Sequence, residues 1–368
     1  MGSRSAGAAL LLGLAFAGVA TAQPGALSPA YAAALERYVA GDRDGAVAAA
    51  TALSERELRV QVEALRSLGR RARACQACLD SVAWRRTPVP AALMLHTDCS
   101  MAQRPDGTSI RLHESLALEL AQAMTDDLEW RGFAKRWYRV MAELALGDTR
   151  WSDALTWAGR GLDAFPRMAE LLLVEGAIEE GLSGELASRS PGDVFEPSAA
   201  QTQLNLGRDR EARQRLERAR RLLRDAIAQD PSLHEVRLRL GRVEWRLGEV
   251  DEARTAFEAV LAQTQSRDTA FLAHLFRGRL DEDAGRLEDA VRDYESALAL
   301  DARSQSARLA LSHARLKLGD ATAARREVEA ALAAAPRWAN LDPFWVYPWG
   351  PAAGVEERLE ALRQEASP

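Results

Sequence analysis

Three stretches in the second half of the chain share one pattern: LGRVEWRLGEVDEARTAF (240–257), RGRLDEDAGRLEDAVRDY (277–294) and LSHARLKLGDATAARREV (311–328). Each stretch carries a small residue, then a glycine, an alanine and a bulky apolar residue. In that order they are Gly241, Gly248, Ala253 and Phe257; Gly278, Gly285, Ala290 and Tyr294; and Ser312, Gly319, Ala324 and Val328. The glycine is typical of the left-handed residue that ends a helix. The pattern therefore predicts pairs of amphipathic helices that approach closely at the small residues.

The repeats extend beyond these three stretches. Gly207 and Gly241 lie thirty-four residues apart, as do Gly278 and Ser312, so we expect a further helix pair to begin near residue 200. Weaker copies of the pattern occupy residues 31–53 and 146–166.

These residues resemble the tetratricopeptide repeat family. The strings that carry the resemblance are Leu240-Gly241, Leu247-Gly248, Ala284-Gly285-Arg286 and Ala297-Leu298, with the alanines and aromatic residues between them. The resemblance implies an all-α fold, a right-handed α-solenoid of stacked antiparallel helix pairs that contact only their neighbours. It also implies a concave groove lined by the first helix of each pair.

The chain divides into five parts on this basis. We expect a signal peptide (1–22), a divergent N-terminal helical region (23–130), degenerate repeat units (131–199), the repeat array (200–336) and a C-terminal capping segment (337–368). The last part carries five aromatic residues and three prolines between Trp338 and Pro351. We expect this irregular segment to fold over the last helix pair, with contact to a ligand as the alternative.

The first residues of the chain have the pattern of a secretory signal. Arg4 precedes a charge-free apolar run from Ala6 to Ala20, and Ala20-Thr21-Ala22 supplies a small-x-small cleavage site. The run is too short to span a bilayer as a helix. We expect an exported protein, periplasmic or secreted, without a membrane span in the mature chain; an uncleaved signal anchor is the alternative.

Composition excludes several classes of function. The formal charge is −5, with 48 basic and 53 acidic residues, which argues against a nucleic-acid partner. Arg208 to Arg224 holds eight arginines, but acidic neighbours one helical turn away favour an ordinary solvated surface. The sequence has no hydrolase or metalloprotease motif and no phosphate-binding glycine loop, so we expect no enzyme activity and no cofactor.

Cations follow the small residue of each expected first helix. Arg208, Arg242, Arg279 and His313 hold this position, and Arg239, Trp245 and Arg246 share the same expected face. Arginine grips carboxylates with two parallel hydrogen bonds. We therefore expect the groove to bind an extended peptide with acidic residues or a C-terminal carboxylate. Because arginine is the default cation of this chain, composition alone is the alternative explanation.

The three cysteines support a second hypothesis. Cys75, Cys78, His96 and Cys99 have the spacing of a zinc site. An exported location favours instead a disulfide from Cys99 to Cys75 or Cys78. A redox-active pair and buried thiols are the other possibilities.

Two functions follow from these patterns. The first is a non-enzymatic scaffold of the cell envelope that binds a protein or an extended peptide in its groove. The alternative is a zinc- or disulfide-stabilised envelope protein in which the Cys75, Cys78, His96 and Cys99 region carries the role.

Overall fold

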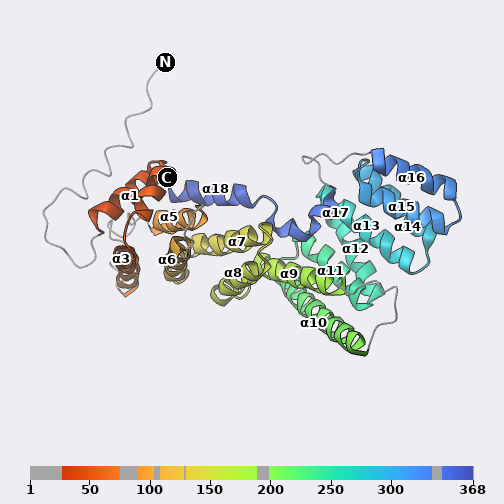
Figure 1. The fold of residues 1–368 in the computed structure, drawn as a ribbon, viewed down its shortest axis with the longest axis horizontal. Helices are drawn as coiled ribbons and strands as arrows, with labels where there is room; N and C mark the ends of the chain where they lie inside the picture. Colours follow the sequence, from red (N-terminus) through yellow and green to blue (C-terminus); the bar gives the residue numbers. More distant parts are fainter. Residues whose placement is uncertain are drawn as a thin grey trace, which may run out of the picture. The chain divides into compact units, whose positions relative to one another are not determined.

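The computed structural model describes residues 27–74, 89–102, 108–127, 130–188, 199–333 and 342–367. In these ranges the chain is built from helices without strands, which confirms the all-α prediction (Figure 1). The chain forms two compact units. Unit 1 comprises Met1–Ala134 and Glu360–Pro368, and unit 2 comprises Lys135–Leu359. The proposed signal peptide lies outside the described residues.

Unit 1 is formed by both ends of the sequence. Its helices are α1 (Pro29–Val39), α2 (Arg43–Thr51), α3 (Glu55–Ala74), α5 (Val89–Met101) and α6 (Thr108–Thr125), with the first residues of α7 and the last of α18. Arg363 binds the Asp98 carboxylate at 2.6 Å, and Glu360 binds Arg43 at 2.7 Å. These ion pairs attach residues near the C-terminus to α5 and α2.

Unit 2 is a stack of helix pairs. The pairs are α7 (Arg131–Gly147) with α8 (Trp151–Ala164), α9 (Ala169–Ser188) with α10 (Ala199–Gln229), α11 (His234–Leu247) with α12 (Val250–Gln263), α13 (Arg267–Asp283) with α14 (Leu287–Leu300), and α15 (Gln305–Lys317) with α16 (Ala321–Ala333). The chain ends with α17 (Pro343–Val346), the 3-10 helix η2 (Tyr347–Ala352) and α18 (Val355–Ala366). The solenoid prediction is confirmed.

The small residues act as the pattern predicts. A Cβ atom on Gly241 would lie 2.7 Å from the ring of Phe257, and one on Gly278 would lie 2.7 Å from the ring of Tyr294. In the last pair, the Ser312 hydroxyl donates to the backbone oxygen of Ala324 at 2.9 Å. Each first helix therefore touches its partner at the small residue.

The turn glycines are also as expected. The backbone is left-handed at Gly248, Gly285 and Gly319, with φ of 94°, 75° and 89°. An L-residue with a side chain is strained in this conformation, so glycine fixes where the first helix ends.

The prediction that a helix pair begins near residue 200 is wrong. Residues Ala199–Gln229 form the single helix α10, drawn in green in Figure 1, and it packs against α9. Gly207 lies inside this helix and does not adopt the left-handed backbone that ends α11 at Gly248. The segment has no internal proline and is rich in arginine, leucine, alanine and glutamine, which all favour helix. Arg208 consequently lies on the second helix of its pair.

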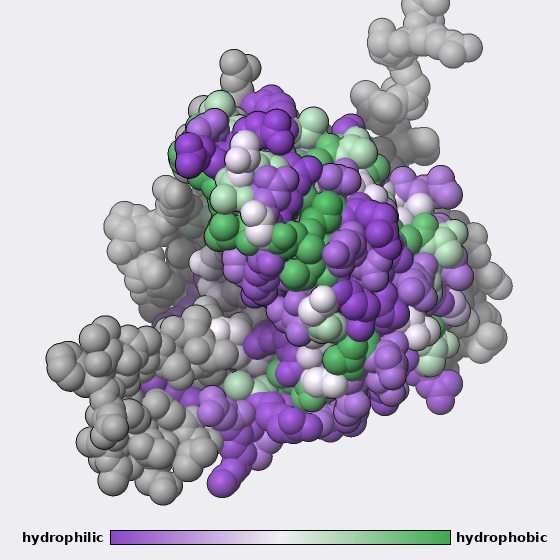
Figure 2. All heavy atoms as spheres, turned by 90° about the vertical axis from the view of Figure 1, so that its right-hand side faces the viewer, coloured by the Kyte–Doolittle hydropathy of each residue, from purple (hydrophilic) through white to green (hydrophobic). Residues whose placement is uncertain are grey.

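The expected place of the C-terminal cap is corrected in part. Asp342 contacts the start of α15 in the last pair, as expected. The residues that follow contact earlier pairs: α17 packs on α13, and η2 packs on α9. The last pair keeps large apolar side chains exposed at Leu309, Leu316 and Leu332, and Figure 2 shows apolar surface on this side of the molecule. Contacts therefore do not join only neighbouring pairs.

None of the helices in the described ranges combines the length and the apolar character needed to cross a membrane.

Candidate functional site

The first helices of successive pairs, α9, α11, α13 and α15, form one face of unit 2, which we call the inner face. Residues 342–354, which we call the C-terminal strap, lie against it. The strap contains α17 and η2, and its contacts define the candidate site.

Asp342 holds the beginning of the strap at the first turn of α15. Its carboxylate accepts hydrogen bonds from the Ser304 hydroxyl at 2.7 Å and from the Ser306 backbone N–H at 2.9 Å. The same carboxylate accepts from the Phe344 backbone N–H at 3.0 Å. An acidic side chain is favoured at the start of a helix because it accepts from unpaired N–H groups. The Asp342 carboxylate therefore caps the N-terminal ends of both α15 and α17.

Aromatic rings form the middle of the site. Phe276 of α13 meets the edges of two strap rings, Phe344 with a centroid distance of 6.4 Å and Tyr347 with one of 5.2 Å. The Phe276–Tyr347 rings cross at 79°, the edge-to-face geometry that aromatic pairs prefer. Phe276 and Tyr347 are both buried in the apolar core of the array.

Tyr347 is enclosed by charged groups. Its hydroxyl donates to Glu180 of α9, with distances of 3.0 and 3.1 Å to the two carboxylate oxygens. The guanidinium groups of Arg239 and Arg242 lie 4.3 and 4.7 Å from its ring centre, within the range of cation–π interaction. Arg239 also donates to the Tyr347 carbonyl oxygen at 2.5 Å.

Glu180 is the centre of a buried ion network. It accepts from Arg239 at 3.2 Å and from Arg242 at 3.0 Å, while Arg239 donates to Glu235 at 3.1 Å. Arg246 donates to the Glu180 backbone oxygen at 3.0 Å. Glu180 and Arg239 are each 1% exposed. The hydrogen bonds within the network therefore replace the hydrogen bonds to water that both charged groups lose on burial.

Burial and charge act on the pKa values of this network. Burial opposes the charged form of Arg239, but Tyr347, Glu235 and Glu180 together raise its pKa above the ordinary arginine value. Burial, followed by the nearby Glu180 charge, raises the pKa of Tyr347. Burial lowers the pKa of Arg246. Arg239 therefore stays charged and Tyr347 keeps the proton that it donates.

The structure separates the residues expected in one column. Arg239, Arg242 and Arg246 meet around Glu180, and Trp245 packs against the apolar core. Arg279 and His313 lie instead beside Glu282, together with Lys317 at 2.9 Å. The buried partners Glu180, Tyr347 and Glu282 were absent from the prediction. The signal for Glu180 was two adjacent acids, Glu179-Glu180, which follow the apolar pair Ala177-Ile178 in α9.

A cavity of about 470 Å³ lies beside the end of the strap in unit 2, lined among others by Glu143, Glu170, Glu235, Gly350 and Arg358. Its charges are largely paired, since Arg139 and Arg358 bind the Glu143 carboxylate at 2.7 and 2.6 Å. Burial raises the pKa of Glu143 despite these two arginines.

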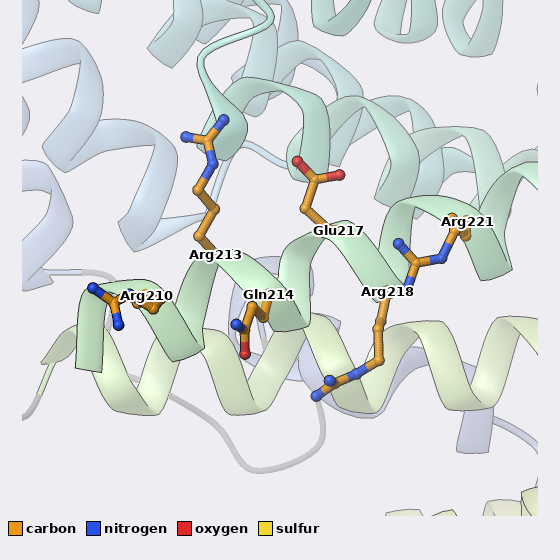
Figure 3. A pocket seen from close by; sticks show the side chains of 6 residues that line it. All are labelled: Arg210, Arg213, Gln214, Glu217, Arg218 and Arg221. Carbon is orange, nitrogen blue, oxygen red and sulfur yellow. The ribbon is translucent and has the colours of Figure 1, made fainter. Parts of the chain in front are cut away.

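The arginine-rich stretch of α10 lines a shallow hollow of about 340 Å³ (Figure 3). Arg213 and Glu217 project from one side of the helix, and Gln214 and Arg218 project from the other. Arg218 is engaged with the buried Glu179 at 3.1 Å. The side chains do not converge on one point, which agrees with an ordinary charged surface.

His96 of the cysteine hypothesis is buried in unit 1. Its Nδ1 lies 2.8 Å from Nδ1 of His113, and its Nε2 lies 3.0 Å from the Tyr31 hydroxyl. Burial, followed by the neighbouring His113, lowers the pKa of His96 to about 3, so the ring is neutral. A neutral ring can donate from Nδ1 to His113 and accept from Tyr31 at Nε2.

Cys99 is buried, with its Sγ 4.0 Å from the Val47 backbone oxygen. Cys75 and Cys78 lie outside the described residues, so the zinc and disulfide pairings stay predictions. Among the described residues, no three histidine, cysteine or acidic side chains are grouped as metal ligands.

Comparison with known proteins identifies the repeats. The tetratricopeptide repeat family model matches residues 204–268 and 277–337. No curated protein matches the chain.

The chain is also similar to solved structures of MamA. One MamA crystal structure is 16% identical over 53% of this chain and 94% of its own, with a TM-score of 0.39. A double mutant of MamA RS-1 is 16% identical over 54% and 93%, with a TM-score of 0.40. MamA 41-end from Desulfovibrio magneticus RS-1 is 17% identical over 54% and 94%, with a TM-score of 0.38. Likenesses at this level carry no conclusion about function.

Proposed function

Because this chain is a tetratricopeptide repeat protein, we propose that it is a non-enzymatic scaffold that binds a protein or peptide partner on its inner face. A preformed stack of helices can hold an extended segment without first ordering itself, which lowers the entropic cost of binding.

One observation carries this proposal: an aromatic segment of the chain itself, built from two short helical turns, already occupies the inner face. The strap is held by a helix-capping carboxylate at Asp342, by aromatic contacts at Phe344 and by the ion network at Tyr347. Apolar anchor residues seated on a helical surface are a recurring mode of peptide recognition.

The chemistry of the ligand differs from the sequence-based expectation. An acidic peptide was expected because of the arginines, but Arg239 and Arg242 are already neutralised by Glu180 and Glu235. A ligand at this position gains less from carboxylates than from aromatic and backbone contacts. We therefore propose a short, aromatic protein segment as the ligand.

Site-specific photo-crosslinking tests the binding face. A photoreactive residue in place of Arg279, which is 48% exposed on α13, should crosslink a protein partner in cells. The matched control is the same residue in place of Arg292, which is 70% exposed on α14, the second helix of that pair. Equal products at both positions, or products at position 292 alone, would show that the inner face is not the binding surface.

We also propose that the protein is exported and acts in the periplasm or outside the cell, on the basis of residues 1–22. Cell fractionation and N-terminal sequencing test this, with a mature N-terminus at Gln23 as the expected result. A cytoplasmic protein that retains residues 1–22 would contradict the proposal.

A further inference from the structure

Four side chains of the inner face enclose one tyrosine, and we propose that they form a tyrosine-binding subsite for short helical protein segments. Glu180, Arg239, Arg242 and Phe276 form the subsite, and Tyr347 is its occupant in the resting chain. This inference rests on the proposed scaffold function and names the class of ligand.

The hydroxyl makes the subsite selective for tyrosine over phenylalanine. Glu180 is buried and accepts the hydroxyl proton in a hydrogen bond of 3.0 Å. A phenylalanine ring would fill the same space between Arg239, Arg242 and Phe276 but has no donor for this carboxylate. A hydrogen bond to a charged group contributes about 1.5–3 kcal/mol, which corresponds to roughly a tenfold or greater difference in affinity.

Arg239 binds the backbone of the same residue whose hydroxyl binds Glu180. It faces the tyrosine ring and donates to the carbonyl oxygen of the same residue at 2.5 Å. Tyr347 has helical backbone angles, φ −49° and ψ −42°, and lies at the end of α17, where carbonyl oxygens have no partner within the helix. The subsite therefore recognises a tyrosine at the end of a short helical turn.

Contacts of the residues before the tyrosine define further positions of the ligand. Asp342, five residues before the tyrosine, caps α15, and Phe344, three residues before it, packs on Phe276. Between them and the tyrosine, Trp345 is 54% and Val346 is 38% exposed, so these two positions accept other residues.

Close approach fixes one more position. A Cβ atom on Gly350 would lie 2.6 Å from Glu235 and 3.1 Å from Arg239. A side chain here would have to displace the end of the Glu235 or Arg239 side chain, so glycine is favoured three residues after the tyrosine. The ligand class is a protein segment with an acid, an aromatic residue, a tyrosine and a preferred glycine at the relative positions −5, −3, 0 and +3.

Covalent connection gives the strap an advantage over any partner. A tethered segment acts at an effective concentration in the millimolar range. A partner segment must therefore bind more tightly than the strap, or be present at a higher concentration than the strap's effective concentration. Substitutions that weaken the strap should make the subsite available to a partner.

The experiment measures binding of a fluorescent peptide of residues 341–351 to the full-length chain by anisotropy. The Phe344→Ala/Tyr347→Ala chain, with its strap weakened, should bind this peptide at least tenfold more tightly than the unmodified chain. Trp345→Ala is the matched control, because it removes an exposed ring of the strap and should behave as the unmodified chain does. A peptide with phenylalanine in place of Tyr347 should bind the vacated chain about tenfold more weakly.

Circular dichroism establishes that each variant is folded. If the double variant does not fold, hydrogen exchange of the Tyr347→Phe chain replaces it. Exchange should then accelerate at least tenfold in residues 343–352 and stay unchanged in residues 311–328.

The outcomes separate this inference from the proposed function. A folded double variant that does not bind the peptide, or that binds the tyrosine and phenylalanine peptides equally, overturns the tyrosine subsite. Hydrogen exchange of the strap that is unchanged by Tyr347→Phe overturns it as well. Peptide binding without any crosslinked partner at position 279 supports the subsite and rejects the scaffold function.

Discussion

The Tyr347 hydroxyl and the Glu180 carboxylate, 167 residues apart in sequence, form a hydrogen bond of 3.0 Å in the interior of unit 2. Glu180 belongs to the first helix of one pair, and Tyr347 follows the last pair of the array. This bond, together with the two arginines around it, joins the strap to α9 and α11.

Glu180→Gln should destabilise unit 2 by about 3 kcal/mol, because removal of one partner leaves buried arginine charge without its counter-ion. The melting temperature should fall by roughly 6–12 °C for a unit of this size. Glu329→Gln, at an exposed position of α16, is the control and should change stability by less than about 0.5 kcal/mol. Calorimetry measures both. Equal melting temperatures for the two variants would contradict a central role of Glu180.

Gly241→Ala should destabilise the array by about 1–3 kcal/mol, because the added methyl group overpacks the contact with Phe257. Gly159→Ala is its matched control. A Cβ atom there meets nothing within 4 Å, and the backbone is helical, so this variant should gain about 0.5–1 kcal/mol. Urea unfolding followed by circular dichroism gives both values. A gain in stability in both variants would show that the helices do not approach closely at Gly241.

Pairs of α10 arginines should differ in their effect on stability. Arg215→Gln/Arg218→Gln leaves the buried Glu179 without the two cations that bind it at 3.1 Å, and should cost about 2 kcal/mol. Arg210→Gln/Arg213→Gln removes the same charge from exposed positions and should stay within about 0.5 kcal/mol. Thermal unfolding at low and physiological salt measures both. A similar loss in the two variants would point to a general effect of charge.

Stability of unit 1 should decrease as the pH falls below about 6.5. The pKa of His96 is lowered from 6.5 to about 3 in the folded chain, so only the unfolded chain takes up this proton between these values. The contribution is complete above the unfolded pKa and decreases by about 1.4 kcal/mol for each pH unit below it. Urea unfolding at pH 7.0 and 5.5 should show this loss, and His96→Gln should reduce it. An unchanged pH dependence in the variant would assign it to other groups.

The helix pairs could be predicted from the sequence because their signals are local. A glycine with left-handed backbone, such as Gly248, and a small residue opposite a ring, such as Gly241 opposite Phe257, recur within one repeat. The same signal misled at Gly207. There the surrounding residues favour helix strongly enough to continue α10 through the glycine, and the resulting single helix packs against α9.

The candidate site could be predicted only in part. Helical spacing placed Arg239, Arg242 and Arg246 on one face, and the structure brings them together. Their partner was not predictable from spacing, because Tyr347 and Glu180 meet across 167 residues. Aromatic and proline content showed that the strap is irregular and apolar, but not which apolar surface it covers.

The ion pairs of Arg363 with Asp98 and of Glu360 with Arg43 join residues 265 and 317 positions apart within unit 1. An open solenoid can fold repeat by repeat while the ribosome still makes the rest of the chain. Unit 1 cannot do so, because part of its packing is supplied by residues that are translated after the whole array. Such long loops close slowly and make folding dependent on distant contacts. The order of folding is thereby reversed along the chain: the unit that begins the sequence is completed only after the array that follows it.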